Sequence, residues 1–181
     1  MATTVVIPTR NRPDALGACL DAISRQTIAA ELEIVVVDDG SREAARVAEI
    51  VTVHPGAILI RTAAAGPSSA RNVGAASARG ALVLFTDDDC RPAADWAERL
   101  VDALRGGADA VAGSTLNGAD GSPFAEASQL VANALVVPVA KGSPSVSFAP
   151  SNNLGCRVDI VRAIPFDASF GAPGGEDRDW C

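Results

Sequence analysis

Three consecutive aspartates, Asp87, Asp88 and Asp89, follow the apolar segment 81–85 with one residue, Thr86, between them. Adjacent carboxylates repel one another, so a folded chain that places them together needs a positive counter-charge close by. Hard divalent cations prefer oxygen ligands, and Mg²⁺ is commonly held by one or two carboxylates together with substrate phosphates. The three aspartates therefore predict a site for a metal ion and a diphosphate.

A structural alternative assigns Asp88 or Asp89 to the N-cap of a helix that starts at Pro92 and leaves the other carboxylates in solvent. Two further acids weigh against this alternative, because Asp38 and Asp39 follow another apolar segment, 33–37. One capping aspartate is common. Acidic groups at the ends of two strands are better explained by a ligand.

Polar residues also follow the first apolar segment, and they are expected near the same site. Thr9 and Arg10 follow the first apolar segment, 5–7. Ligands of open α/β sheets bind outside the carboxyl ends of the strands. If these apolar segments are neighbouring parallel strands, Thr9 lines the same site as the aspartates.

The elements that position these residues alternate along the chain. Continuous apolar runs predict strands at 5–7, 33–37, 57–60, 81–85 and 109–112, of which the first two are expected to be buried. Apolar residues at helical spacing, with prolines at several starts, predict intervening helices from Pro13, from about Arg42, over 67–79 and from Pro92. This alternation indicates an α/β fold with a mainly parallel central sheet and helices on both faces.

After Gly113 this alternation stops. The composition predicts a loop over 113–123, a helix over 124–137, a short strand at either 146–148 or 153–155, and a short helix over 159–163. The residues after Gly175 resemble the start of another helix.

Composition limits the class of protein. A chain of 181 residues with 48% hydrophobic and 20% charged residues is typical of one globular domain. Tyrosine is absent and aromatic residues make up only 4%, so small residues must fill the core and favour close packing of helix on sheet. A formal charge of −7 argues against nucleic acid as a partner.

The sequence shows no signal peptide and no apolar run of the roughly 20 residues that a membrane span needs. The four cysteines have no metal-binding spacing, which favours reduced thiols and a cytoplasmic location. Cys90, beside the aspartates, is interpreted as a packing residue. The single histidine, His54, is interpreted as a surface residue in a turn.

Five motifs, taken together, resemble those of family 2 glycosyltransferases. In chain order they are Val5-Val-Ile-Pro-Thr-Arg-Asn-Arg12, Val35-Val-Val-Asp-Asp-Gly-Ser41, Ser69-Ala-Arg-Asn-Val-Gly74, Phe85-Thr-Asp-Asp-Asp89 and Gly174-Gly-Glu-Asp-Arg-Asp179. The resemblance implies a GT-A fold (Rossmann-like), a nucleotide-sugar donor and inversion at the anomeric carbon.

The resemblance also implies roles for the acidic run. The family's DxD motif falls on Asp87 and Asp89. Asp89 would bind the Mn²⁺ or Mg²⁺ ion that bridges the donor diphosphate. Asp87 would bind the same metal or the ribose, and Asp88 would belong to the nucleotide-sugar site.

Three more residues are implied in donor binding. Asp39 would accept a hydrogen bond from the nucleobase, Thr9 would line the base and ribose pocket, and Arg71 would approach the base or the diphosphate. The alternative for Arg71 is a solvated arginine on a helix surface.

The last motif matches the family's catalytic loop. Ser151 to Gly155 resembles the segment before that loop and would either touch the acceptor or form a turn. Asp177 matches the position of the general base, with Glu176 as the neighbouring candidate, and the glycines before them would let the loop approach the sugar closely. The alternative is that Asp177 or Asp179 is only a capping acid at the start of a final helix.

The resemblance implies one catalytic domain over 1–181, with a donor half at 1–112 and a half at 113–181 for the acceptor and the catalytic loop. Family members usually continue beyond the last motif, so the chain is expected to be truncated. The acceptor would carry a sugar, lipid-linked or other hydroxyl, and peripheral contact with a membrane stays open.

Two other functions are alternatives to an active transferase. One is a nucleotide-sugar-binding module without catalysis. The other is a nucleotidyltransferase, which usually has a glycine-rich loop after its first strand; Pro8 to Pro13 contains no glycine.

Overall fold

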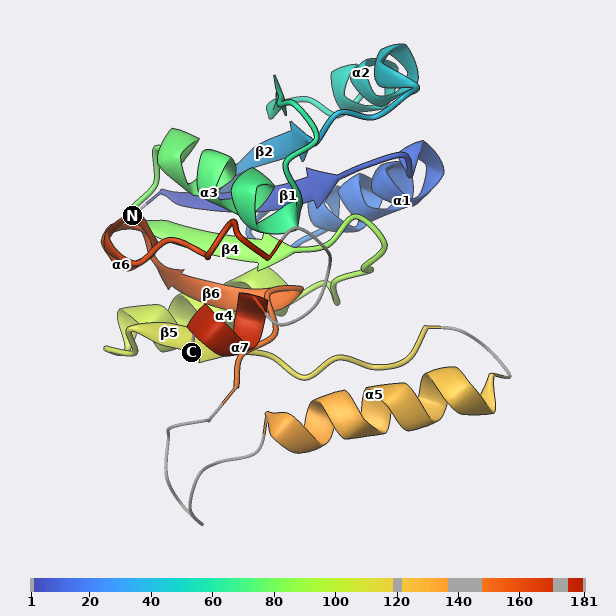
Figure 1. Cartoon of the computed structure of the whole chain (residues 1–181). Coiled ribbons are helices and arrows are strands. Elements are labelled where there is room, and N and C mark those ends of the chain that lie inside the picture. The colour runs from blue at the N-terminus through green and yellow to red at the C-terminus, as the bar shows by residue number, and fades with distance from the viewer. Residues whose placement is uncertain (1, 119–121, 137–147, 171–175, 181) are drawn as a thin grey trace.

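The computed structural model describes residues 2–118, 122–136, 148–170 and 176–180. Its centre is a six-stranded sheet in the order β3-β2-β1-β4-β6-β5 (Figure 1). The strands are β1 Thr3–Thr9, β2 Leu32–Asp38, β3 Ala57–Arg61, β4 Leu82–Thr86, β5 Ala110–Ala112 and β6 Asn153–Arg157.

The sheet is mainly parallel, as the sequence predicts. Strand β1 pairs in parallel with both β2 and β4, and β2 pairs in parallel with β3. Strand β6 is antiparallel to its two neighbours, β4 and β5. Of the two alternatives for the last strand, the one at 153–155 is therefore confirmed, while residues 146 and 147 of the other lie outside the described residues.

Seven α-helices are described: α1 Pro13–Ser24, α2 Ala44–Thr52, α3 Pro67–Ser77, α4 Trp96–Arg105, α5 Pro123–Leu135, α6 Val158–Ala163 and α7 Glu176–Trp180. A short 3₁₀ helix, Ala29–Glu31, precedes β2. Most boundaries fall within two residues of those that the sequence predicts.

Helices cover both faces of the sheet because its central strands are apolar on both faces. Val5 and Ile7 of β1 belong to one core cluster with α1, α2 and α4. Val6, between them, belongs to the other cluster with α3 and α6. Side chains that alternate along a strand point to opposite faces, so one short apolar run supplies both cores.

Small residues let α3 approach the sheet closely. A Cβ atom at Gly74 would clash with the side chain of Val6 on β1. Ala70 and Ala75, on the same helix, are fully or almost fully buried. This contact confirms the close helix–sheet packing that the low aromatic content predicts.

The prediction that a helix starts at Pro92 is wrong, since α4 starts at Trp96. The cause is a contact with Gln26, which follows α1. The Gln26 amide nitrogen donates to the carbonyl of Ala93 at 2.7 Å, and its Oε1 accepts from the backbone N–H of Ala97 at 2.9 Å. Gln26 thus bonds to the first turn of α4. Asp95 holds the N-cap position of this helix, so Asp88 and Asp89 are not its caps.

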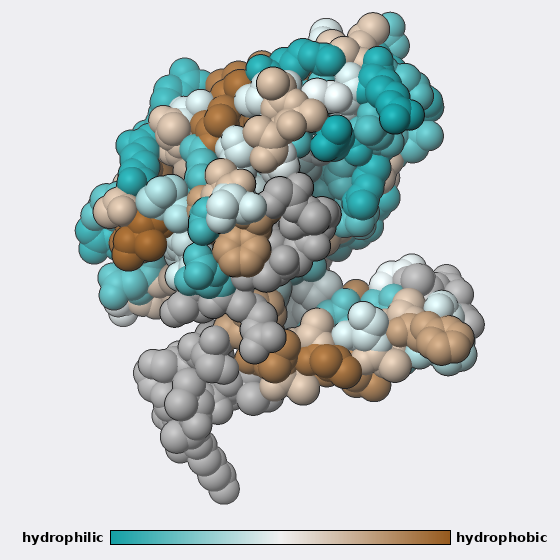
Figure 2. All heavy atoms as spheres, viewed as in Figure 1, coloured by the Kyte–Doolittle hydropathy of each residue, from teal (hydrophilic) through white to brown (hydrophobic). Residues whose placement is uncertain are grey.

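Helix α5 lies apart from the sheet (Figure 1). It has no buried residue, and Figure 2 shows apolar side chains along it. The exposed large apolar residues here are Phe124, Leu130, Val131 and Leu135. Within the described residues, no helix is long and apolar enough to span a membrane.

Candidate active site

A pocket of about 480 Å³ lies at the carboxyl ends of β1, β2 and β4. This is where ligands bind in open α/β sheets. Its lining includes six of the residues predicted from the sequence, namely Thr9, Asp39, Arg71, Asp87, Asp88 and Asp177. The sheet therefore brings the first, second and fourth motifs together, and α3 and α7 add the other two.

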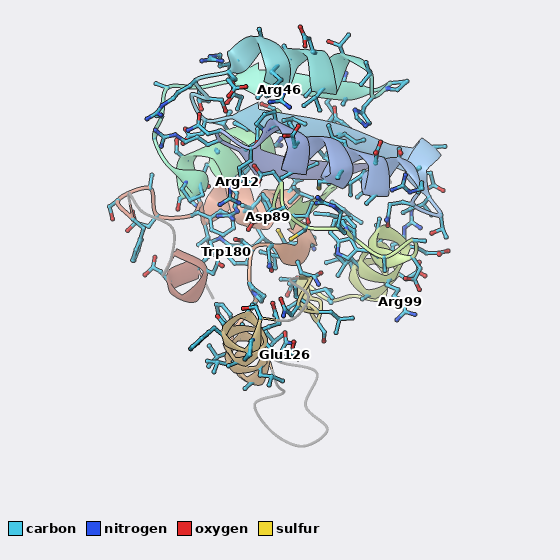
Figure 3. The ribbon with its side chains drawn as sticks, turned by 90° about the vertical axis from the view of Figure 1, so that its right-hand side faces the viewer. Arg12, Arg46, Asp89, Arg99, Glu126 and Trp180 are labelled. Carbon is cyan, nitrogen blue, oxygen red and sulfur yellow. The ribbon has the colours of Figure 1, made fainter. Side chains whose placement is uncertain are left out.

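Two arginines supply the counter-charge that the three aspartates need. Arg71 of α3 donates to Asp87 at 2.7 Å. Arg12, after β1, donates to Asp88 at 3.3 Å and to Asp89 at 2.7 Å. Figure 3 shows Arg12 beside Asp89. No sequence pattern assigned Arg12 to the site, although its position shortly after β1 places it at the same edge of the sheet.

Asp88 is the most enclosed of the three aspartates. Its side chain is only 6% exposed, whereas that of Asp87 is 34% exposed and that of Asp89 is 56% exposed. The Thr9 hydroxyl donates to Asp88 at 2.7 Å. Burial raises the pKa of the Asp88 carboxyl above its ordinary value, and the Thr9 hydrogen bond and the Arg12 charge offset part of that rise.

We expect Asp88→Asn to change how stability depends on pH. A carboxyl whose pKa is higher in the folded state contributes most below its unfolded pKa of about 4, and this contribution is lost as the pH rises through the folded pKa. The amide of the variant cannot ionise. The free energy of unfolding of the wild type should therefore fall relative to that of Asp88→Asn as the pH rises from about 4 through the folded pKa. Urea unfolding of both proteins at a series of pH values measures this; parallel curves would contradict it.

Asp39 braces the loop that leads into α3. Its Oδ1 accepts from the backbone N–H of Ala65 at 2.8 Å and from the Thr62 hydroxyl at 3.2 Å, and its Oδ2 accepts from Gly66 at 2.9 Å. The residue is 4% exposed, yet it lines the pocket. Asp39 thus has a structural role that the sequence analysis did not foresee, and its contact with a base stays a prediction.

We expect Asp39→Asn to lower the free energy of unfolding by about 1–3 kcal/mol, because one of its backbone N–H donors would face an amide NH₂ or lose a charged acceptor. Urea unfolding measures the change. Asp102→Asn, on the exposed side of α4, is the matched control and should unfold as the wild type does. Equal stability of the two variants would show that the Asp39 charge is unimportant to the loop.

Arg71 is not a solvated helix residue. It is 4% exposed, pairs with Asp87, and lies over the ring of Phe166 with 5.9 Å between its guanidinium carbon and the ring centroid. An arginine held between a carboxylate and an aromatic ring is fixed in orientation. The alternative of a surface arginine is therefore excluded.

Asp177 lies on α7 and lines the pocket. Its Oδ2 accepts from the backbone N–H of Ser151 at 3.2 Å. This bond connects α7 to the segment before β6, and the role of Asp177 as a base stays a prediction. Ser151 and Asn152 also line the pocket, while Asn153 starts β6. The side chain of Glu176, the neighbouring candidate, lies outside the described residues.

Cys90 and His54, the two residues that the sequence places outside the chemistry, agree only in part with their predicted surroundings. Cys90 is half-buried and has a free thiol. His54 lies in the turn between α2 and β3, as predicted, but its side chain is only 13% exposed. It is held by the carbonyl of Ile50 at 2.7 Å and by Asp21 at 3.2 Å.

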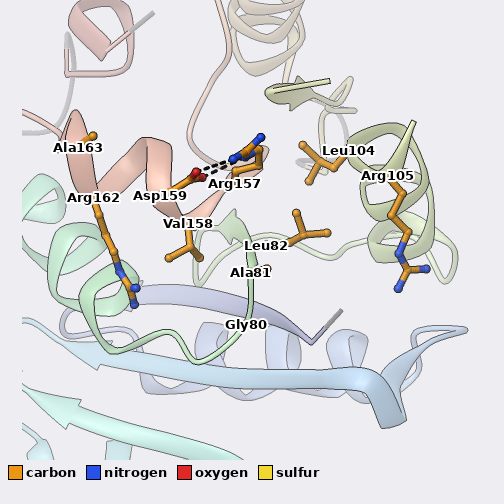
Figure 4. A pocket seen from close by; sticks show the side chains of 10 residues that line it. All are labelled: Gly80, Ala81, Leu82, Leu104, Arg105, Arg157, Val158, Asp159, Arg162 and Ala163. Atoms are coloured by element: carbon orange, nitrogen blue, oxygen red, sulfur yellow. Dashed lines mark hydrogen bonds and ion pairs between the residues drawn. The ribbon is translucent and has the colours of Figure 1, made fainter. Parts of the chain in front are cut away.

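A larger cavity, about 840 Å³, lies at the opposite, amino end of β4 (Figure 4). Three arginines line it, but protein groups already engage them. Arg157 pairs with Asp159, and Arg162 donates to three carbonyls at the end of α3. Arg105 lies 3.8 Å from Glu31. The acidic motifs are absent from this lining, so we assign the chemistry to the smaller pocket.

The described residues contain no group of three or more His, Cys, Asp or Glu side chains arranged to hold a metal ion. Asp87 and Asp89 are nevertheless partly exposed carboxylates at one strand end. A divalent cation there would need oxygen atoms from a bound ligand to complete its coordination, which is common for Mg²⁺ in phosphate sites. The donor set therefore fits a cation only together with a ligand.

Comparison with known proteins decides the family. The family described as Glycosyl transferase family 2 matches residues 4–164. The chain belongs to glycosyl transferase family 2. All five motifs that carry the sequence resemblance are present, and the first four lie within the matched range.

Curated relatives of this family 2 member carry glycosyltransferase names. The glycosyltransferase AglE of Haloferax volcanii is 36% identical over 118 residues, which are 61% of this chain and 38% of the relative. The dolichol-phosphate mannosyltransferase of Pyrococcus furiosus is 31% identical over 116 residues, 63% of this chain and 33% of the relative. The chain thus matches well under half the length of these relatives.

Solved structures share the fold of this family 2 member. S. aureus TarS 1–349 in complex with UDP has a TM-score of 0.76 at 21% identity, covering 99% of this chain and 54% of TarS. The mannosyltransferase PcManGT from Pyrobaculum calidifontis, in complex with GDP-Man and Mn²⁺, has a TM-score of 0.75 at 24% identity. The match covers 98% of this chain and 50% of PcManGT. The fold is therefore GT-A, as the resemblance implied.

Proposed function

We propose that this family 2 member transfers a sugar from a nucleoside diphosphate sugar to an acceptor hydroxyl, with inversion at the anomeric carbon. The observation that carries the proposal is a single pocket lined by both Asp87 and Asp177, which come from distant parts of the chain. A leaving diphosphate needs its charge stabilised, and an attacking hydroxyl needs a base. Asp87 would help to meet the first requirement and Asp177 the second, and both line one cavity.

The donor is expected to be a nucleotide sugar because TarS binds UDP and UDP-GlcNAc and PcManGT binds GDP-Man. Thr9 and Asp39 would line the base and ribose, with Asp88 holding Thr9 in place. The Asp39 carboxylate already accepts three hydrogen bonds. Two oxygens offer about four acceptor sites, which leaves capacity for a donor group of the base.

A divalent cation, Mn²⁺ or Mg²⁺, would be held by Asp89 and Asp87 together with the donor diphosphate. When bound, it would act as a Lewis acid for the leaving diphosphate. Arg12 now neutralises Asp89 in an exposed pair, which contributes little to stability. Exchanging this guanidinium for a cation would therefore cost the fold little.

Asp177 would take the proton from the acceptor hydroxyl. The backbone N–H of Ser151 holds one of its oxygens and orients the carboxylate at the pocket. A base on the opposite side of the sugar from the leaving group suits inversion in one displacement. The acceptor would present a sugar, lipid-linked or other hydroxyl, and Glu176 is the next candidate for the base.

A non-catalytic nucleotide-sugar-binding module is the second candidate, because Thr9, Asp39 and Asp87 line the pocket from the strand ends, independently of the proposed base on α7. Both candidates bind the donor, and only the transferase turns it over. The nucleotidyltransferase alternative gains no support from the loop between β1 and α1, residues 10–12, which contains no glycine.

The test is a thermal-shift screen of UDP-, GDP- and dTDP-sugars, each with and without Mn²⁺. A ligand that binds only the folded state adds about 2.7 kcal/mol of stability at a hundred times its Kd. We expect one nucleotide class to raise the melting temperature, and more so with Mn²⁺. Nucleoside diphosphate release from that donor then separates the transferase from the binding module. If no nucleotide sugar raises the melting temperature, both the transferase and the binding module are rejected.

A further inference from the structure

One aromatic residue outside the five motifs connects the donor pocket to α7. Phe166, in the segment after α6, is 2% exposed. Its ring meets Phe85 of β4 edge-on, with ring centroids 5.5 Å apart, and stacks on Trp180 of α7 at 5.3 Å. The guanidinium of Arg71 lies over the same ring.

The backbone of Phe166 is held by a side chain of α3. The Asn72 amide nitrogen donates to the Phe166 carbonyl at 2.8 Å, and the Phe166 N–H donates to the Asn72 Oδ1 at 2.9 Å. Two bonds from one planar amide fix both the position and the direction of that backbone segment. A side chain that pairs in this way imitates one step of a β-ladder.

Helix α7 has a second anchor in the same segment. The Trp180 indole N–H donates to the Ile164 carbonyl at 2.6 Å. The helix has five residues, too few to be stable alone. Its position therefore depends on tertiary contacts, and the contacts of Trp180 with the Ile164 to Phe166 segment are prominent among them.

We propose that Asn72 is a positioning residue. Its two hydrogen bonds hold the backbone of Phe166, and we call this pair of bonds the clamp. The ring of Phe166 in turn fixes Trp180, and so the position of Asp177 on the same helix relative to the pocket. The proposal rests on the assignment of Asp177 as the base. Asn72 itself touches none of the proposed reacting atoms. Because Asn72 follows Arg71 on α3, one short stretch of helix would orient both the diphosphate side and the base side of the pocket.

The first readout is the fluorescence of Trp180, which needs no activity. The chain has two tryptophans, and Trp96 is buried with its N–H bonded to Asn153 at 2.9 Å. Subtracting the signal of a Trp180→Phe variant isolates Trp180. We expect Asn72→Ala to make Trp180 more accessible to quenching by acrylamide. Ser77→Ala, which removes an exposed hydroxyl from the same helix, should leave quenching unchanged.

The second readout separates positioning from binding. A displacement of about 1 Å at a reacting group can lower a rate about a hundredfold. We expect Asn72→Ala to lower kcat for release of nucleoside diphosphate by about that factor, with little change in donor KM. Loss of both kcat and donor affinity with normal Trp180 quenching would mean that Asn72 supports only Arg71, which overturns the proposal.

Phe166→Leu gives an independent test if Asn72→Ala does not fold. This variant keeps the backbone clamp and removes the ring on which Trp180 stacks, so Trp180 should again become more accessible. Quenching equal to the wild type in a folded variant would overturn the proposal. If the wild-type chain binds no nucleotide while quenching still rises in both variants, the clamp stands and the proposed function fails instead.

Discussion

Asp177→Asn should reduce sugar transfer by about 10²–10⁴-fold, the usual contribution of a general base, while donor binding stays as in the wild type. An asparagine keeps an oxygen that can accept from the Ser151 N–H, so α7 should remain in place. It cannot accept a proton from the acceptor. Steady-state release of nucleoside diphosphate, together with donor titration by calorimetry, measures the two effects separately.

The matched control for this variant is Asp179→Asn. Asp179 lies on the same short helix, is exposed, and undergoes the same change of charge. It should keep full activity. Full turnover by Asp177→Asn would place the base elsewhere, with Glu176 the next residue to substitute.

Asp89→Ala should abolish the Mn²⁺-dependent part of nucleoside diphosphate binding and leave the fold intact. The carboxylate is 56% exposed and its partner is the equally exposed Arg12, so the pair contributes about 0–1 kcal/mol to stability. Its loss removes one of the two carboxylates proposed to hold the cation. Calorimetric titration with the diphosphate, with and without Mn²⁺, measures the difference.

Asp95→Ala is the control for this second prediction. Asp95 is another acid paired with an exposed arginine, Arg99, at 2.6 Å, but it directly precedes α4 and is not part of the acidic run that follows β4. Removing it should change neither nucleotide affinity nor its dependence on Mn²⁺. If Asp89→Ala retains the full metal-dependent gain in affinity, the cation is held by other groups.

The fold was largely predictable because apolar strands alternate with amphipathic helices. The runs at 5–7, 33–37 and 81–85 are continuous and apolar, which is the pattern of strands buried on both faces. The start of α4 was not predictable. Its boundary is set by Gln26, which reaches the first turn from the end of α1, and no local pattern reports that contact.

The candidate site was predictable in its acids and much less in its other residues. Asp39 and Asp87 to Asp89 could be found because they end apolar runs and form unusual clusters. Arg12 and Asn72 could not, because an arginine in a loop or an asparagine on a helix has many uses. Their partners, Asp88, Asp89 and Phe166, are distant in sequence.

The sequence alone determined where most of the strands lie, that they run mainly parallel, and that polar groups collect at their carboxyl ends, because hydrophobic periodicity and turn chemistry are local properties. Only the tertiary structure decided which basic groups pair with the acidic groups at these strand ends. It placed Arg12 and Arg71 against three aspartates, turned Asp39 toward the loop before α3, and brought Asp177 to the pocket. Electrostatic energy depends on distance and burial, and the order of residues along the chain does not fix either one.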